Sequence, residues 1–211
     1  MNGLSKYYIK KIIGCFADEF TATETSRKLK VNRNTVNKYY RIIREAIADY
    51  QEMLFNGQAK NGNDTVFCLY WHRSNGITTA NEPDAVTYHL TLLNSRVYIE
   101  DKAPKKADQT AGAPEQASAE ENAAALHELA TTGLTGRNNG GAKNVETAYN
   151  FFLYAKDKLT KFYGVKEEYS YLYLKELTFR FNNRDKDVSQ IIWKILPHHS
   201  PEWAKTSRYR K

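Results

Sequence analysis

The chain has 211 residues, 41% hydrophobic and 13% aromatic, which is enough apolar material for one or two packed domains. It contains no apolar run near the roughly 18 residues of a membrane span and begins with no secretory leader, so we expect a cytoplasmic protein without a membrane partner. Only two cysteines are present, Cys15 and Cys68, and their spacing excludes a disulfide framework and a cysteine zinc site within this chain.

The net charge of +7 is unevenly distributed along the chain. Residues 1–60 hold 11 basic and 6 acidic side chains, residues 61–143 hold 7 and 10, and residues 144–211 hold 13 and 8. Two basic ends around an acidic middle predict two modules that face an anionic partner. Solvated surface charge is the alternative interpretation.

Residues 102–143 differ in composition from the rest of the chain. Of these 42 residues 11 are alanine and none is aromatic, which predicts a low-complexity linker with one short helix between Ala119 and Ala130. The expected organisation is therefore an N-terminal helical domain at 1–56, a β-rich segment at 62–101, this linker, a C-terminal helical part at 144–197 and a basic tail at 198–211.

Three helices are predicted in the first 56 residues. The first carries one apolar stripe, formed by Ile9, Ile12, Ile13, Phe16 and Phe20. A short second helix follows Thr21, and its small Ser26 would let another helix approach closely. Asn32 is a suitable N-cap for a longer third helix, whose buried face is expected to contain Val36, Tyr40, Ile43 and Ile47.

A short helix joined by a tight turn to a longer one is the pattern of a helix-turn-helix DNA-binding unit. Asparagine can pair with an adenine edge, arginine with guanine, and lysine or threonine with phosphate. The candidate DNA contacts are the polar and basic residues left on the outer surface of the third helix, namely Arg33, Asn34, Thr35, Asn37, Lys38 and Arg41. A plain three-helix bundle with a polar face is the alternative.

Three later segments have the alternation and composition of strands, at 65–71, 85–93 and 96–99, with a turn signal at Asn75 and Gly76. They predict a small antiparallel or mixed sheet. His72 and His89 have no suitably spaced partners, so we expect them to be polar strand-end and sheet-face residues rather than metal ligands.

The region after residue 144 is helical and aromatic, with helices expected at 146–164, 168–184 and 188–196, the last capped by Asp187. Within the second of these helices, three charged residues stand four apart on one face: Glu176, Arg180 and Arg184. They can either pair with each other or present two guanidinium groups to phosphate.

Residues 151–165 and 171–184, the latter reading YLYLKELTFRFNNR, resemble the C-terminal end of the DDE transposases of ISXO-type bacterial insertion sequences. Residues 21–47 are similar to the helix-turn-helix of the same group. The two matches occur in the order that the family has, and most of the middle of the chain lies outside them.

In that family an RNase H-like domain places two aspartates on strands and a third polar or acidic residue on a helix. These residues hold two divalent metal ions that activate the attacking hydroxyl group and stabilise the leaving oxygen. The resemblance implies Mg²⁺ as cofactor, Glu146 as the third metal-site residue, Lys156 as a lysine that orients DNA, and Glu100 or Asp101 near the second aspartate. It also implies a homo-oligomer that binds double-stranded transposon ends in the bacterial nucleoid.

The chain departs from the family where the first aspartate belongs, because no acidic strand follows the helix-turn-helix region. We therefore predict an α+β protein with a helix-turn-helix domain, a strand-rich remnant of an RNase H-like fold and C-terminal helices. Its expected function is DNA strand transfer as an insertion-sequence transposase, or that of a degenerate derivative, and the sequence leaves catalysis open. The alternatives are a non-catalytic DNA-binding protein or regulator and a helical interaction protein with no nucleic-acid role.

Overall fold

A computed structural model gives the structure of the protein and describes residues 4–57, 65–72, 76–78, 85–100, 140–159 and 167–196. The described residues combine helices with an antiparallel sheet, so the predicted α+β class is confirmed. The chain divides into two compact units, one of residues 1–54 with 183–211 and one of residues 55–182. Within the described ranges, no helix has the length and apolar character needed to cross a membrane.

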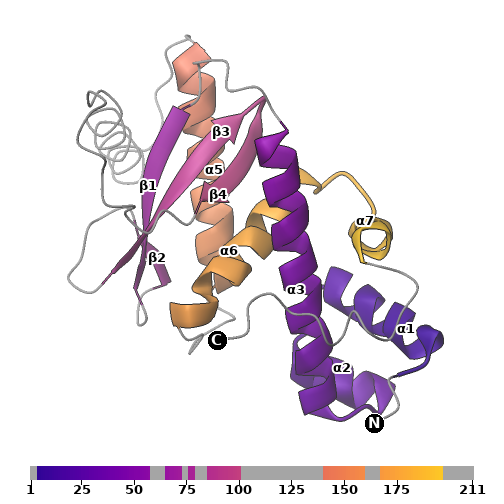
Figure 1. The fold of residues 1–211 in the computed structure, drawn as a ribbon. Coiled ribbons are helices and arrows are strands. Elements are labelled where there is room, and N and C mark those ends of the chain that lie inside the picture. The colour runs from indigo at the N-terminus through magenta and orange to yellow at the C-terminus, as the bar shows by residue number, and fades with distance from the viewer. Residues whose placement is uncertain are drawn as a thin grey trace, which may run out of the picture. The chain divides into compact units, whose positions relative to one another are not determined.

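The first unit contains α1 (Lys6–Ala17), α2 (Ala22–Leu29) and α3 (Arg33–Asn56, of which the part up to Leu54 lies in this unit), shown in Figure 1. Its core confirms most of the apolar faces that the spacing predicts, although Ile9 and Phe20 are half-buried and Phe20 lies beyond the end of α1. The buried side chains include Ile12, Ile13 and Phe16 from α1 and Val36, Tyr40, Ile43 and Ile47 from α3.

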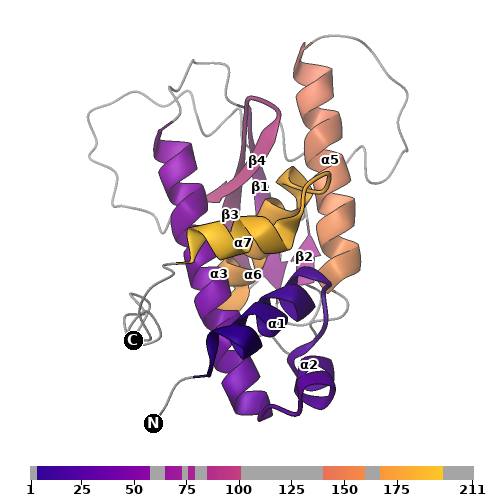
Figure 2. The ribbon, with the colours of Figure 1, turned by 90° about the vertical axis from the view of Figure 1, so that its right-hand side faces the viewer.

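The C-terminal helix α7 (Val188–Ile195) belongs to this same unit and packs on α1, as Figure 2 shows. The sequence instead groups it with the preceding C-terminal helices. Its Ile192 is fully buried. Asp187 is the N-cap, as predicted, and accepts hydrogen bonds from the Ser189 hydroxyl group at 2.7 Å and the Gln190 N–H at 3.1 Å. These two bonds lower the pKa of Asp187 below its ordinary value.

Helices α1 and α2 are both followed by a left-handed residue that is not glycine. Glu19 has φ 62° and Lys30 has φ 54°. After α2, the Val31 N–H donates to the Ser26 carbonyl at 3.3 Å, and the Ser26 hydroxyl donates to the Val31 carbonyl at 2.7 Å. Ser26 thus closes the turn that leads into α3, a role beyond the small size noted from the sequence.

Substituting Lys30→Gly is expected to stabilise the protein by about 1 kcal/mol, because a left-handed conformation costs a residue with a Cβ atom about that much. The measurement is the midpoint of urea unfolding. Lys30→Ala is the matched control, since it removes the charge but keeps the Cβ atom. Equal stabilisation by both substitutions would show that charge, and not backbone conformation, is responsible.

The second unit contains a sheet of β1 (Thr65–His72), β2 (Gly76–Thr78), β3 (Val86–Leu93) and β4 (Arg96–Glu100). The strand order is β2-β1-β3-β4, and each neighbouring pair is antiparallel. The three predicted strands are confirmed. Strand β2 is an addition, because three residues are too few to show an alternating pattern. The turn between β3 and β4 has positive φ at both Asn94 and Ser95, the conformation that suits a tight hairpin.

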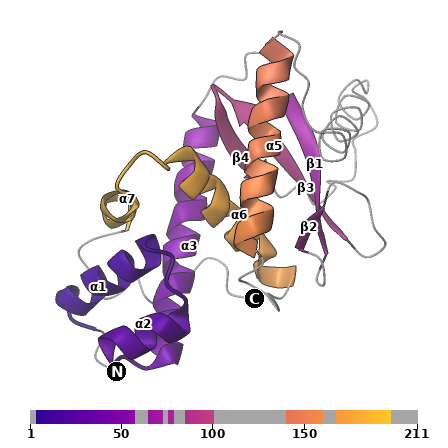
Figure 3. The ribbon, with the colours of Figure 1, turned by 180° about the vertical axis from the view of Figure 1, so that it is seen from behind.

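Helices α5 (Gly140–Leu159) and α6 (Glu167–Asn182) cover one face of this sheet, as Figures 1 and 3 show from opposite sides. Helix α5 begins at Gly140, inside the run expected to be a flexible linker, and α6 ends two residues before its expected end at Arg184. The remainder of the expected linker, with its helix at 119–130, lies outside the described residues. The core between sheet and helices includes Phe67, Leu69, Leu90, Ile99, Phe151, Ala155, Leu174 and Leu177.

The outer edge of β4 is satisfied by a side chain from α6. The Val97 N–H donates to Asn182 Oδ1 at 2.9 Å, and Asn182 Nδ2 donates to the Val97 carbonyl at 2.7 Å. The amide group of Asn182 therefore replaces the neighbouring strand that an edge strand lacks. A second bond, 2.6 Å between the hydroxyl groups of Tyr88 and Ser170, joins β3 to the start of α6.

Substituting Asn182→Asp is expected to destabilise the protein by about 1 kcal/mol, because a carboxylate can accept from the Val97 N–H but cannot donate to the Val97 carbonyl. Asn182 is half-buried, so water offsets part of the loss. The measurement is the free energy of unfolding of variant and wild type at pH 7 and again near pH 3, where the introduced carboxyl group is protonated and can donate. A loss that is the same at both pH values would contradict this explanation.

Candidate nucleic-acid interface

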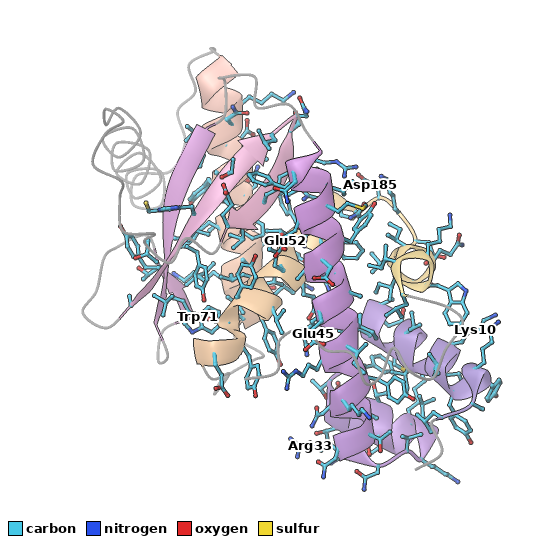
Figure 4. All side chains as sticks on the ribbon, viewed as in Figure 1. Lys10, Arg33, Glu45, Glu52, Trp71 and Asp185 are labelled. Atoms are coloured by element: carbon cyan, nitrogen blue, oxygen red, sulfur yellow. The ribbon has the colours of Figure 1, made fainter. Side chains whose placement is uncertain are left out.

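The N-terminal end of α3 presents polar and basic side chains to solvent. Asn32 opens the helix as predicted, because its Oδ1 accepts the Asn34 N–H at 2.8 Å. Only three residues separate the end of α2 at Leu29 from the start of α3 at Arg33. The candidate contacts Arg33, Asn34, Asn37 and Lys38 are exposed, and Thr35 is half-buried. Figure 4 labels Arg33 at this end of the helix.

Two linked hydrogen bonds hold α3 in place on its buried face. The Tyr40 hydroxyl donates to the Phe20 carbonyl at 2.9 Å and lies 2.6 Å from Thr25 Oγ1. Because Tyr40 gives its one proton to Phe20, Thr25 must be the donor in the second bond. These hydrogen bonds connect α2, the turn before it and α3. The Phe16 ring packs edge-on against Tyr40, with 5.0 Å between centroids.

The charge around this surface is mostly positive. Arg27 and Lys28 are exposed on α2, and Lys30 follows them in the turn. The acidic residue of α2, Glu24, forms a capping box with Thr21, in which its Oε2 accepts the Thr21 N–H at 2.7 Å. The positive end of the α3 dipole adds to the potential that an anion would meet.

Arg41 lies beyond the exposed cluster on α3. Its Nε donates to Glu45 Oε1 at 2.9 Å, four residues further along the helix. The arginine side chain is 40% exposed, whereas the glutamate is nearly buried. The ion pair orients the guanidinium group, so Arg41 lies at the margin of the exposed candidate surface rather than at its centre.

The two C-terminal arginines differ in exposure, and only the prediction for Arg180 requires a correction. Arg180 is only 7% exposed and its Nε donates to Glu176 Oε1 at 2.9 Å, so it takes the ion-pair role and is not a surface contact for DNA. Arg184 is exposed but lies after the end of α6, so the expected row of three charges on one helix face does not continue to it.

The candidate metal residues are not brought together. Glu146 and Lys156 are exposed on α5, which packs on one face of the sheet. Glu100 lies on the opposite face, where its Oε1 accepts the Thr91 hydroxyl at 2.6 Å. Asp101 lies outside the described residues. The pairing of Glu146 with Glu100 is therefore corrected.

The described strands also lack the two aspartates that the resemblance implies, since Glu100 is their one carboxylate. In the described part of the chain, no three His, Cys, Asp or Glu side chains are placed to hold a metal ion. Among the described residues, these donors therefore do not assemble a two-metal Mg²⁺ site. His89 is a sheet-face residue, as predicted, and is in register with Cys68 on one side and Glu100 on the other.

The sequence does not single out α1 as a binding element. Lys6 and Lys10 nevertheless lie near the ring of Trp193 on α7, and α1 contains no acidic residue. Three lysines and no acidic residue in one helix are a composition signal from which α1 could have been identified as a candidate binding element.

Comparisons of the chain with protein-family models, with curated proteins and with solved structures find no match.

Proposed function

We propose that the protein binds duplex DNA through a helix-turn-helix formed by α2 and α3, with α3 as the recognition helix. The observation that carries the proposal is the group of exposed side chains Arg33, Asn34, Asn37 and Lys38 at the start of α3. The buried contacts of Tyr40 hold that end of the helix in one orientation.

The residue types suit base recognition in a major groove. The amide groups of Asn34 and Asn37 can each form a bidentate pair with adenine, and Arg33 can do so with guanine. Lys38 suits a phosphate, and the N-terminal end of α3 attracts the backbone through its dipole. A bundle with a merely solvated polar face would show no preference among DNA sequences.

The test is selection of bound duplexes from a library with about 25 randomised base pairs, followed by dissociation constants at about 50 and about 200 mM salt. We expect the selected sequence to bind at least about 10³-fold more tightly than unrelated DNA, with a steep loss of affinity in salt. Equal affinity for every duplex would overturn the proposal.

The proposed lineage is the ISXO-type transposases, supported by the ordered resemblance of residues 21–47, 151–165 and 171–184. The natural DNA would then be the ends of an insertion sequence, and the protein would act as an oligomer. The selected sequence should recur on both sides of the gene in its genome. A selected sequence that is absent from both flanks would favour a regulator of other genes.

Metal-dependent strand transfer is the second candidate. Glu146 and Lys156 are both exposed on α5, and the further carboxylates of such a site would have to come from residues outside the described ranges, such as Asp101. Its test is nicking of DNA that carries the element ends in Mg²⁺ or Mn²⁺, compared between the wild type and Glu146→Gln. Nicking that the substitution abolishes would support an enzyme. Binding without nicking in the wild type would leave DNA binding as the function.

A further inference from the structure

Helices α1 and α7 of the first unit form a second cationic surface. Lys6 Nζ lies 5.8 Å and Lys10 Nζ 5.2 Å from the centroid of the Trp193 ring, so one indole contacts two ammonium groups. Lys6 and Lys10 are exposed, and so is Lys194 beside the tryptophan. Figure 4 labels Lys10 on α1, on a different side of the unit from Arg33.

The placement of these lysines is unfavourable for α1 itself. Like charges four residues apart, as in Lys6 and Lys10, destabilise a helix, and a lysine at the first helical position opposes the helix dipole. The helix has no acidic residue to offset either effect. The contacts with Trp193 return part of this energy, because the face of an indole ring attracts cations.

Two exposed tyrosines extend the surface along α1. Tyr7 is 60% and Tyr8 39% exposed, and Lys11 Nζ lies 4.7 Å from the Tyr7 ring. A hydrogen bond with Tyr7 raises the pKa of Lys11, so this lysine stays charged. Ring contacts restrict three long side chains before any ligand binds, which lowers the entropy lost when an anion is bound.

We infer that Lys6, Lys10 and Lys11, held by Trp193 and Tyr7, form a phosphate-binding surface that contacts duplex DNA outside the segment read by α3. The inference rests on the proposed function in taking DNA as the partner, but it concerns a separate surface of the same unit. Clustered ammonium groups without a neighbouring acid on α1 suit the dense charge of a duplex, because each phosphate contact releases a condensed counterion.

Lysines that contact phosphates and no base edges would add affinity for a duplex of any DNA sequence. The recognition helix would supply the preference for one sequence, and α1 with α7 would supply a salt-dependent contact with the backbone. The two contributions are separable by measuring specific and unrelated DNA in parallel.

The experiment compares wild type, the Lys6→Gln/Lys10→Gln double variant and the Lys143→Gln/Lys158→Gln double variant, which loses the same charge on α5. Affinity for the selected duplex and for an unrelated duplex of equal length is measured between about 50 and about 200 mM salt. We expect the α1 variant to lose about 0.9 of the log–log salt slope for each of two phosphates, on both duplexes alike. Across this range the wild type should then lose about tenfold more affinity than the variant.

A slope that falls equally in both double variants would reflect net charge and overturn the inference. An unchanged slope with a lowered unfolding midpoint would show that the lysines only hold α7. The inference would also be overturned if Lys6→Gln/Lys10→Gln lost binding to poly-glutamate or to anionic phosphatidylglycerol vesicles while its affinity for DNA stayed intact. Failure of the proposed function gives a different result, in which Asn34→Ala/Asn37→Ala leaves the sequence preference unaltered.

Discussion

Substituting both Asn34→Ala and Asn37→Ala should raise the dissociation constant for the selected DNA sequence by about 100-fold or more, since each bidentate amide–adenine pair contributes about 1–3 kcal/mol. Affinity for unrelated DNA should change little, because neither side chain carries charge. The measurement is fluorescence anisotropy with the selected and an unrelated duplex at one salt concentration.

The fold should survive this double substitution. The hydrogen bond that opens α3 uses the side chain of Asn32 and the backbone of Asn34, so it remains when the Asn34 side chain is removed. Alanine also favours a helix more than asparagine does. An unchanged unfolding midpoint therefore separates lost contacts with DNA from lost structure.

Two further variants sharpen the result. Lys38→Gln should weaken binding to both duplexes equally and lower the salt slope by about 1, as expected for a phosphate contact. Asn150→Ala on α5 is the matched asparagine control, since Asn150 is also exposed on a helix. If Asn34→Ala/Asn37→Ala weakens both duplexes to the same extent, α3 does not read bases.

The first unit is largely predictable because its signals are local. Apolar spacing places the buried faces of α1 and α3, and the helix starts at Asn32 and Asp187 have side chains that suit an N-cap. The exposed candidates on α3 follow by elimination from its buried face. Thr35 and Arg41 are less simple, because partial burial and pairing with Glu45 depend on neighbours.

Tertiary position is what the sequence does not specify. Arginine four residues after glutamate makes the same pattern in a surface ion-pair ladder and in the buried pair Glu176–Arg180. The apolar face of α7 likewise predicts a buried helix but does not name α1 as its partner. Both outcomes depend on packing between segments far apart in the chain.

The sheet shows the same limit for the candidate metal site. Its strands are recognisable from alternation, yet the residues that share a face across strands depend on register. Glu100 lies in register with His89 and on the face opposite α5, which separates it from Glu146. A resemblance assigns roles to single positions, whereas a metal site requires that the fold bring its donors together.

Substituting Tyr40→Phe is expected to destabilise the protein by about 2–3 kcal/mol. The change removes one oxygen atom but leaves two polar groups without this bond, the buried Thr25 hydroxyl and the part-buried Phe20 carbonyl. Thr25 is fully buried, so water cannot easily replace the missing partner. The measurement is the free energy of unfolding in urea.

A double-mutant cycle with Thr25→Val tests whether these hydroxyl groups act as a chain. Thr25→Val alone should cost about 1 kcal/mol. The combined cost should be smaller than the sum of the two single costs, because Thr25→Val removes the donor that Tyr40→Phe alone would leave without its acceptor. Additive costs would mean that the two bonds contribute independently. Tyr40 is buried on the side of α3 away from the exposed side chains. The DNA affinity of the folded Tyr40→Phe protein should therefore stay close to that of the wild type. That result would mean that Tyr40 positions the helix and does not bind DNA.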